Sequence, residues 1–446
     1  MTDMTEGPAL RKIVGFALPL TAANLLQQGY VLIDGILVGH YVGVDGLAAV
    51  GVAGPMFYLL NAMFIGLGTA FTIRLAHLRG ARQDGERRGV VLALALVTAV
   101  WSAGCVVLAT VAARPVLGLM GIHGQLAEDC ALFFGTLSLG FPAMFGLAAV
   151  SAYFRGLGNS RAAMWVQGFG NVANIVLVWL FLSVLGMGIG GAALATVIAS
   201  AAAFVVGLVA ARRIYPLGRK QDEPAVRREL VDAVRLGFPL ASQHIILAVG
   251  IMVLVWIIQS YGAVVLAAFT IVSRLELFTG MLFLDFSGAV TAFVAQNLGG
   301  ADRDRARRGL VQTLGLTVGL TAVVSAVVLL ARSPIAGLFT GDPATQELTE
   351  RYILIIYPFL VLYTVMVVLH GYLNGSRRTT APLICTLIAF VVVQVPFAYL
   401  LNGPFGIDAV MWAVVAGWTA GLTYTVHCLR DVLFTRPAAV ELKGAS

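Results

Sequence analysis

Residues 162–211 read AAMWVQGFGNVANIVLVWLFLSVLGMGIGGAALATVIASAAAFVVGLVAA, a stretch of fifty residues without a charged side chain. A single helix of that length would extend about 75 Å, because an α-helix rises ~1.5 Å per residue. A membrane crossing needs only about 20 apolar residues, so this stretch must cross twice and fold back. We expect the turn in the glycine-rich segment 186–191. Two successive crossings of this kind place the chain among polytopic membrane proteins.

The composition of the whole chain indicates the same class. Of 446 residues, 59% are apolar and only 11% are charged, and the mean hydropathy is +0.91, whereas charged residues make up about 25% of a soluble protein. A soluble multidomain protein, a disordered chain and a secreted disulfide scaffold are therefore excluded. The four cysteines lack the spacing of a zinc or redox motif, so neither chemistry gains support. They are Cys105, Cys130, Cys385 and Cys428.

The same length test, applied along the chain, predicts an all-α fold with twelve spans. With both termini in the cytoplasm, 25 of the 29 basic residues fall on the cytoplasmic side and one, Arg274, falls within a span. The other three, Arg114, Arg332 and Arg351, fall outside. This asymmetry is typical of a cell (inner) membrane protein and explains the net charge of +7 without a nucleic-acid partner. No cleavable signal peptide is expected. The expected spans are 10–38, 46–77, 89–113, 130–154, 161–185, 189–213, 229–260, 264–297, 308–331, 349–373, 381–402 and 406–432.

An internal repeat divides these spans into two sets of six. Residues 78–89 (LRGARQDGERRG) match residues 298–309 (LGGADRDRARRG) at seven of twelve positions, at an offset of 220. Because six is even, the two halves enter the membrane with the same orientation, and we expect a pseudo-twofold axis along the membrane normal. The sequence predicts an N-terminal lobe over 1–213, a cytoplasmic linker over 214–228 and a C-terminal lobe over 229–446. Transporters built from such repeats place the substrate path between them.

Asp34 is the acid that most needs an explanation, because a charge within a span costs about 2.5–3.5 kcal/mol on insertion scales. Gln27, Tyr30 and Asp34 have the spacing of one polar stripe on a helix. The equivalent position in the second half is Leu254, so the acid belongs to one half only. Tyr30 is placed to hydrogen-bond the carboxyl one turn away.

Neutral polar residues occur in the fifth and sixth spans. Asn171, Asn174 and Thr196 are candidate partners for the Asp34 stripe, although each alone is better explained by hydrogen bonds between helices.

Polar residues in the seventh and eighth spans are candidates for a cavity between the halves. Arg274 and Asp285 share a helix face but lie three turns apart, so they cannot pair directly, and cavity lining and structural ion pairing are both open for them. Glu276 is expected to be solvated near the outer surface. Gln243 and His244 are weaker candidates, because a lone histidine is more often simply packed.

Four segments together resemble one transporter family. They are LPLTAANLLQQGYVLIDGILVG (18–39), RGLGNS (155–160), GAALAT (191–196) and QNLGGA (296–301). In their order and over nearly the whole chain they are similar to the multidrug and toxic compound extrusion (MATE) family.

This resemblance implies a cation-coupled antiporter that exports amphipathic, often cationic compounds by alternating access, without a cofactor and not as an enzyme. Pro19 matches the family's bend in the first helix. The resemblance assigns the cation site to Gln27, Tyr30, Asp34, Asn174 and Thr196.

Two positions depart from the family's sodium-coupled members. Val178 and Leu247 stand where many of them carry acids, which favours coupling to a proton at Asp34 over coupling to sodium. The alternatives are a sodium-coupled exporter and a lipid-linked precursor flippase. A flippase is disfavoured because Arg274 is the one cation available for a pyrophosphate. We expect a monomer whose partners are small molecules and the lipid bilayer.

Overall fold

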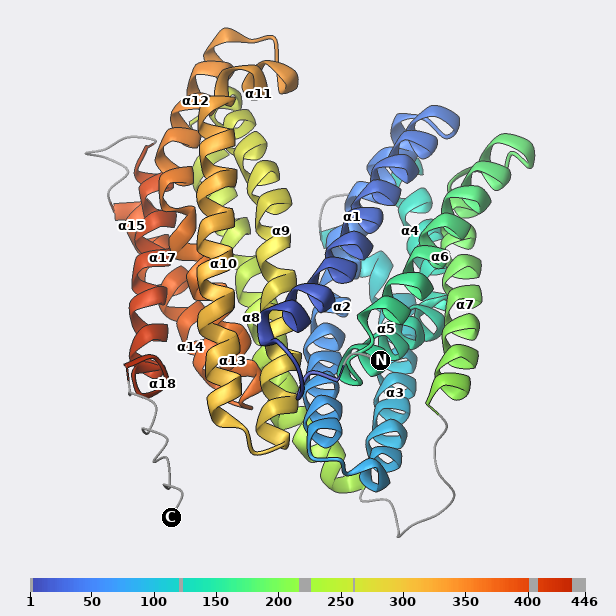
Figure 1. The fold of residues 1–446 in the computed structure, drawn as a ribbon. Helices are drawn as coiled ribbons and strands as arrows, with labels where there is room; N and C mark the ends of the chain where they lie inside the picture. Colours follow the sequence, from blue (N-terminus) through green and yellow to red (C-terminus); the bar gives the residue numbers. More distant parts are fainter. Residues whose placement is uncertain (1–2, 120–122, 216–225, 260, 401–407, 435–446) are drawn as a thin grey trace, which may run out of the picture. The chain divides into compact units, whose positions relative to one another are not determined.

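The computed structural model describes residues 3–119, 123–215, 226–259, 261–400 and 408–434, and these residues form helices joined by short turns, with no strand among them (Figure 1). The helices of the first half are α1 (Ala9–Tyr41), α2 (Val44–Gly80), η1 (Asp84–Glu86), α3 (Arg87–Leu119), α4 (Gln125–Leu139), α5 (Phe141–Gly156), α6 (Ser160–Trp179), η2 (Leu180–Val184) and α7 (Gly188–Ile214). The remaining helices are α8 (Val226–Gln259), α9 (Ala263–Gly299), α10 (Arg303–Leu330), α11 (Arg332–Phe339), α12 (Pro343–Ile356), η3 (Tyr357–Phe359), α13 (Leu360–Gly375), α14 (Thr380–Thr386), η4 (Leu387–Gln394), α15 (Val395–Leu400), α17 (Asp408–Cys428) and α18 (Arg430–Phe434).

The long apolar helices confirm the expected membrane fold. Eleven helices among the described residues are long and apolar enough to cross a membrane, and the bent pair α4–α5 makes a twelfth span. The expected turn between the fifth and sixth spans is also confirmed. Gly186 and Gly188 both adopt a φ of +61°, a conformation that favours glycine, and the chain reverses there between η2 and α7.

The bend of 50° between α4 and α5 has a local cause. Pro142 lies in the first turn of α5 and cannot donate a backbone hydrogen bond. At Gly140, between the two helices, a Cβ would lie 2.5 Å from Cγ2 of Val197. The bend therefore lets the chain pass directly against α7.

The repeat is visible in individual contacts at an offset of 219 residues. Thr72 donates its hydroxyl hydrogen to the carbonyl of Ala152 at 3.1 Å, and Thr291 donates to the carbonyl of Gly371 at 3.1 Å. Arg82 and Ala301, at equivalent turns, are both non-glycine residues with positive φ, at 56° and 60°. Each half therefore contains the same contact between its second and fourth spans.

The chain divides into two compact units. Unit 1 comprises residues 1–5 and 14–245, and unit 2 comprises 6–13 and 246–446. The boundary lies within α8, because the first half of that helix packs on α2. At Gly66, a Cβ would lie only 2.4 Å from the backbone nitrogen of Ala241. Most of the expected linker, residues 216–225, lies outside the described residues.

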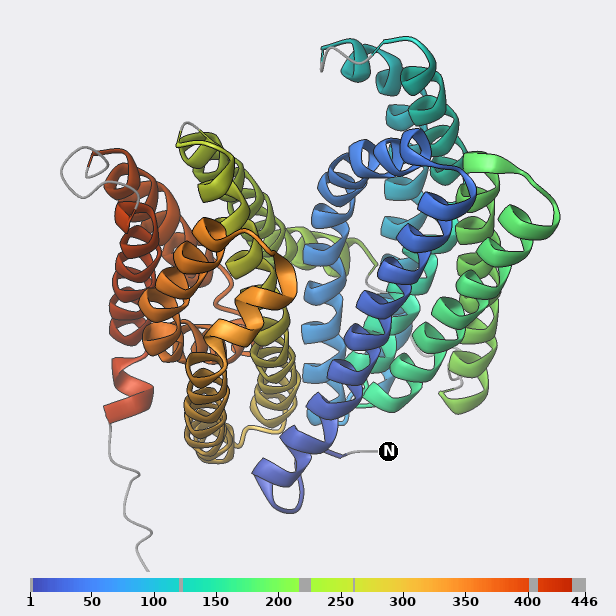
Figure 2. The ribbon, with the colours of Figure 1, turned by 90° about the horizontal axis from the view of Figure 1, so that it is seen from above.

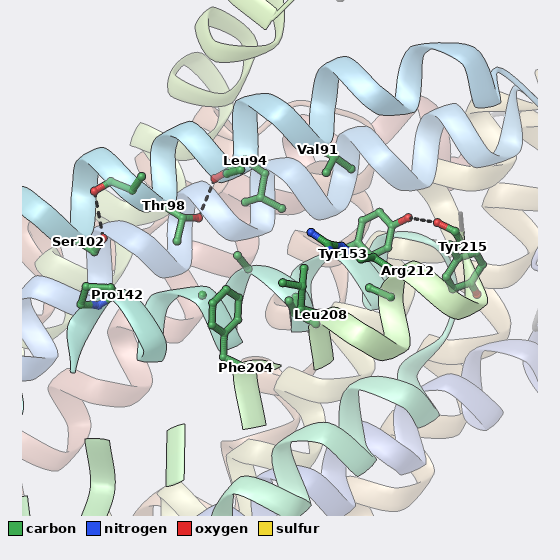
Figure 3. Close-up of a pocket in the computed structure, with 16 residues that line it drawn as sticks. Val91, Leu94, Thr98, Ser102, Pro142, Tyr153, Phe204, Leu208, Arg212 and Tyr215 are labelled. Atoms are coloured by element: carbon green, nitrogen blue, oxygen red, sulfur yellow. Dashed lines mark hydrogen bonds between the residues drawn. The ribbon is translucent and has the colours of Figure 1, made fainter. Parts of the chain in front are cut away.

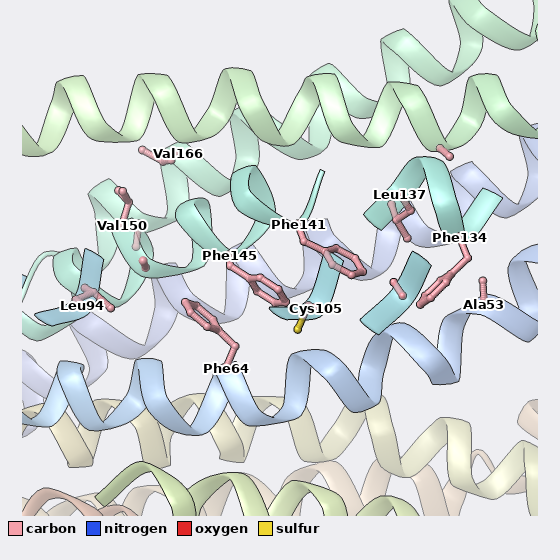
Figure 4. Close-up of a cluster of buried hydrophobic side chains, with 14 of the residues drawn as sticks. Ala53, Phe64, Leu94, Cys105, Phe134, Leu137, Phe141, Phe145, Val150 and Val166 are labelled. Atoms are coloured by element: carbon pink, nitrogen blue, oxygen red, sulfur yellow. The ribbon is translucent and has the colours of Figure 1, made fainter. Parts of the chain in front are cut away.

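The core of unit 1 is built around aromatic side chains from α2 and α5 (Figure 4). The ring centroids of Phe64 and Phe145 are 4.8 Å apart, and those of Phe141 and Phe145 are 5.6 Å apart. All three side chains are at most 1% exposed. This packing fixes the bent span against α2 and leaves the outer helices α1, α6 and α7 to carry the polar side chains described next.

Candidate functional site

The polar stripe of α1 makes its clearest contact with α6. Nε2 of Gln167 donates a hydrogen bond to Oε1 of Gln27 at 2.9 Å. Pro19 lies within α1, two turns before Gln27. The structure therefore joins the expected residue Gln27 to Gln167, which was not among the residues predicted from the sequence.

A second hydrogen bond joins α6 to α7. Nδ2 of Asn174 donates to Oγ1 of Thr196 at 2.9 Å, and that hydroxyl donates to the carbonyl of Ala192 at 3.2 Å. Asn174 is only 4% exposed, and its Oδ1 is buried without a hydrogen-bond partner in the described part of the chain. Asn174 and Thr196, which were expected as partners of the Asp34 stripe, thus bond to each other, and the amide oxygen of Asn174 remains available.

The register of α1 against α6 places Asp34 and Asn174 at corresponding positions. Both helices run side by side in the same direction (Figures 1 and 2). Asp34 follows Gln27 by seven residues, and Asn174 follows Gln167 by seven. Seven residues are about two turns and ~10 Å along either helix, on the same face.

Three polar atoms at this level have no hydrogen-bond partner among the described residues. They are Asp34 Oδ1, Asn171 Nδ2 and Asn174 Oδ1, and all three are buried. No hydrogen bond joins Asp34 to Tyr30 within the described ranges, so the expected bond from the Tyr30 hydroxyl is not formed. Buried polar atoms are normally paired, so the two unpaired oxygens, Asp34 Oδ1 and Asn174 Oδ1, make this level of α1 and α6 the candidate site, with the unpaired donor Asn171 Nδ2 one turn away.

The positions that distinguish a proton site from a carboxylate-rich sodium site are apolar. Val178 is fully buried, one turn beyond Asn174 on α6. Leu247 is 36% exposed on α8. No group of three or more metal-ligating side chains is found within the described residues.

The candidates on α9 occupy different environments from those expected. Arg274 is exposed, whereas Asp285 is 6% exposed. The two make no ion pair with each other, as their separation predicts. Glu276 was expected to be solvated, and this is wrong: its Oε1 is buried without a hydrogen-bond partner among the described residues.

The environment of Glu276 explains its burial. It lies within electrostatic range of the hydroxyls of Tyr357 and Tyr363, which come from η3 and α13. Thr279, one turn further along α9, lies 3.5 Å from the Tyr357 hydroxyl. Packing of α9 against η3 and α13 thus encloses the carboxyl, and the α9 sequence gave no signal of this.

The two candidates on α8 are half-buried. Nε2 of Gln243 donates to the carbonyl of Pro239 in its own helix at 3.4 Å. This contact within its own helix accounts for Gln243 by a local structural role. His244 makes no hydrogen bond in the described part of the chain.

Comparison with known sequences identifies the family. The MatE family model matches residues 19–180 and again residues 239–400, and the two matches begin 220 residues apart, as the repeat predicts. The chain is 27% identical over 415 residues to "Probable multidrug resistance protein YoeA" of Bacillus subtilis (strain 168), covering 90% of this chain and 89% of that protein. It is 26% identical over 415 residues to "Probable multidrug resistance protein NorM" of Thermotoga maritima, covering 89% of this chain and 86% of that protein.

Comparison with solved structures gives the same fold. The crystal structure of a MATE protein in the bent conformation superposes with a TM-score of 0.89 at 22% identity, covering 96% of each chain. Two consecutive family matches, relatives of nearly full length and this shared fold agree with one another. The chain therefore belongs to the multidrug and toxic compound extrusion family, whose members are membrane transporters and not enzymes.

Proposed function

We propose that this protein exports amphipathic, often cationic compounds in exchange for protons, with Asp34 as the residue that binds the proton. The observation that carries the proposal is the level of α1 and α6 at which Asp34, Asn171 and Asn174 each keep a buried, unpaired polar atom. The names of the relatives, which refer to multidrug resistance, support a drug as the exported compound.

The chemistry of coupling follows from the environment of Asp34. An ionised carboxylate buried without a partner is unfavourable, so such a group is stabilised by a proton or by a cationic ligand. Protonation of Asp34 and binding of a cationic drug then exclude one another by charge. Exchange of the two across the membrane is antiport.

Sodium coupling is the second candidate, because neutral oxygens of α6 and α7 could bind a small cation. Oδ1 of Asn174, Oγ1 of Thr196 and backbone carbonyls are the hard ligands that a small cation prefers. Val178, fully buried and apolar, argues against it, because the site then holds one carboxylate only. The flippase alternative gains no support from the relatives reported above.

The proposed topology places both termini and the basic loops near residues 81–88 and 301–308 in the cytoplasm. The support is the asymmetry of basic residues, which is typical of bacterial inner-membrane proteins. We further propose that the protein acts as a monomer, since each unit contains its own core.

The function is tested with the full chain in proteoliposomes loaded with a fluorescent cationic dye such as ethidium. A proton gradient and a sodium gradient are imposed separately, the latter at fixed pH. We expect dye movement to follow the proton gradient and to be indifferent to sodium. Dye movement driven by sodium alone would overturn proton coupling, and no movement under either gradient would overturn export of cationic compounds.

A further inference from the structure

A cavity of about 690 Å³ lies in unit 1, where α3 and α7 both pack on α5 (Figure 3). Each helix lines it with one stripe: Val91 to Ser102 on α3, Pro142 to Tyr153 on α5, and Phe204 to Tyr215 at the end of α7. At Gly146, a Cβ would lie 2.8 Å from the ring of Phe204, so this glycine lets the ring pack directly on α5. None of the candidate coupling residues lines the cavity.

The length and lining of this groove suit one hydrocarbon chain. Each stripe covers eleven residue steps, about 16 Å along the helix, which is half of the ~30 Å hydrocarbon core of a bilayer. The hydroxyls of Thr98 and Ser102 donate to carbonyls of their own helix, at 2.7 and 3.0 Å. The body of the groove is therefore apolar over the depth of one lipid leaflet.

The groove is open along α3. Ala95 and Ala99 line it and are themselves exposed. In a membrane-spanning chain, exposed apolar side chains are covered by lipid. The groove thus opens toward the bilayer.

One end of the groove is polar. The Tyr153 hydroxyl donates to the carbonyl of Tyr215 at 3.4 Å, and their rings meet edge to face with centroids 6.1 Å apart. Tyr215 is 4% exposed, and its own hydroxyl is buried without a hydrogen-bond partner among the described residues. Arg212 lines the same end, is exposed, and makes no ion pair within the described ranges.

We propose that this groove binds one anionic phospholipid, with an acyl chain along α5 and the phosphate held by the Arg212 guanidinium and the Tyr215 hydroxyl. Arginine and a phenolic O–H are both donors, and a phosphate presents only acceptors, so the polar end is complementary to the headgroup in charge and in hydrogen bonding. Tyrosines are also enriched where the headgroups begin. The proposal requires the membrane location of the chain and does not depend on the coupling ion.

The chemistry selects a lipid over other occupants. A free phosphate would fill only the polar end and leave the apolar groove empty. An exported cationic compound would be repelled by Arg212. A phospholipid satisfies both ends at once, and its anionic headgroup is attracted further by the adjacent Arg213.

Native mass spectrometry of the purified full chain tests the headgroup contact, with phosphatidylglycerol added to delipidated protein. We expect Arg212→Gln to weaken phosphatidylglycerol binding about tenfold, the loss typical of a charge-assisted hydrogen bond. The matched control is Arg213→Gln, which removes the same charge from a neighbouring residue that does not line the cavity. A much smaller loss is expected there. Equal binding by both variants would overturn the proposal.

The groove itself is tested by filling it. Ala99 is exposed and lines the cavity, whereas Ala103, one turn further on α3, is exposed and does not. We expect Ala99→Trp to reduce binding and Ala103→Trp to leave it unchanged, with the unfolding temperature of each variant checking that it folds. We also expect phosphatidylglycerol to raise the unfolding temperature of the unmodified protein and inorganic phosphate to leave it unchanged. Equal stabilisation by inorganic phosphate, or unchanged binding in Ala99→Trp, would refute an acyl chain in the groove.

Discussion

Asp34 differs from other acids of unit 1 in its partners. Glu86 and Glu229 each approach the guanidinium of Arg74 to 2.7 Å, and Asp84 pairs with Arg87 at 3.5 Å. Oδ1 of Asp34 is buried and accepts no hydrogen bond among the described residues. A paired carboxylate is held ionised by its partner, whereas an unpaired one is free to change its protonation state.

Asp34→Asn is expected to abolish proton-driven dye export while the protein still folds. Asparagine keeps the size and the hydrogen-bonding oxygen but does not titrate. Removing an unpaired buried acid should leave the unfolding temperature unchanged or raise it. The measurement is dye movement in proteoliposomes under a proton gradient. Asp45→Asn is the control, since Asp45 is an exposed acid at the start of α2. Full transport by the Asp34→Asn variant would contradict the role of Asp34 as the proton-binding residue.

Val178→Asp is expected to create a sodium response that the unmodified protein lacks. Val178 is fully buried one turn beyond Asn174, so a carboxylate there would add oxygen ligands next to the amide. The unpaired charge should lower stability in potassium chloride, because burying it is costly. Sodium chloride should restore part of that loss. Unfolding temperatures measured in the two salts at equal ionic strength check this, and identical values in both would show that no cation site forms.

The α1 stripe could be predicted from the sequence because helical spacing reveals which residues share a face. The bond from Asn174 to Thr196 could not, because the two residues lie on different helices. Gln167 was missed, although it continues the spacing of Asn171 and Asn174 and was thus detectable. The burial of Glu276 was not detectable. It depends on which helix packs against α9, and spacing within one helix carries no information about its neighbour.

At the scale of the element, the contact between α2 and the first half of α8 combines close backbones with a buried ion pair. Nε and Nη2 of Arg74 donate to both carboxylate oxygens of Glu229, at 2.7 to 3.2 Å, and the side chains are 8% and 4% exposed. The sequence repeat gave no indication of this pair, which joins α2 to the helix after the predicted linker. It explains why the compact unit ends within α8.

Glu229→Gln is expected to reduce the free energy of unfolding by about 3–5 kcal/mol, since it leaves a buried guanidinium without its main counter-charge. The control is Glu128→Gln. Glu128 pairs with Arg114 at 3.4 Å, but both side chains are more than half exposed, so the loss should be within about 1 kcal/mol. Chemical denaturation of both variants in the same detergent compares them. Equal losses would show that the Arg74–Glu229 pair does not stabilise the contact.

The start of α12 is expected to lose stability in acid through Asp342. Its Oδ2 accepts hydrogen bonds from the backbone nitrogen and the hydroxyl of Thr345, at 2.9 and 2.6 Å. The bond from the hydroxyl is the main reason that the pKa of Asp342 lies below its ordinary value of 3.8. Because the pKa of Asp342 is lower in the folded protein, its ionised form stabilises the start of α12. This stabilisation is complete above the ordinary pKa and is lost as the pH falls through the lowered pKa. Hydrogen exchange of α12 amides should therefore accelerate below about pH 4, and less so in Asp342→Asn. An equal acceleration in that variant would assign the acid sensitivity to other groups.

For the whole molecule, the two halves have the same arrangement of helices, but only the first half carries an acid at the position of Asp34. Equivalent hydrogen bonds from Thr72 and Thr291 preserve the contact between spans in both units. The position equivalent to Asp34, however, is Leu254, which is 2% exposed. The repeat was predictable because loop residues at a fixed offset match. The unit boundary within α8 was not, because contacts between helices determine it.

The topology predicts that equivalent loops of the two halves lie on the same side of the membrane. Six spans separate the loop at Gly85 from the loop at Asp304, and six separate Gln125 from Ala344, each pair being 219 residues apart and exposed. An even number of crossings returns the chain to the side from which it started.

The experiment labels single introduced cysteines after Cys428, the one native cysteine that is not buried, is replaced by serine. We expect a membrane-impermeant maleimide to label Gln125→Cys and Ala344→Cys in intact cells. Gly85→Cys and Asp304→Cys should react only after permeabilisation, because their loops carry the basic clusters. Labelling of one member of a pair from outside and the other only after permeabilisation would require an odd number of spans between them, and would refute the repeat as a membrane topology.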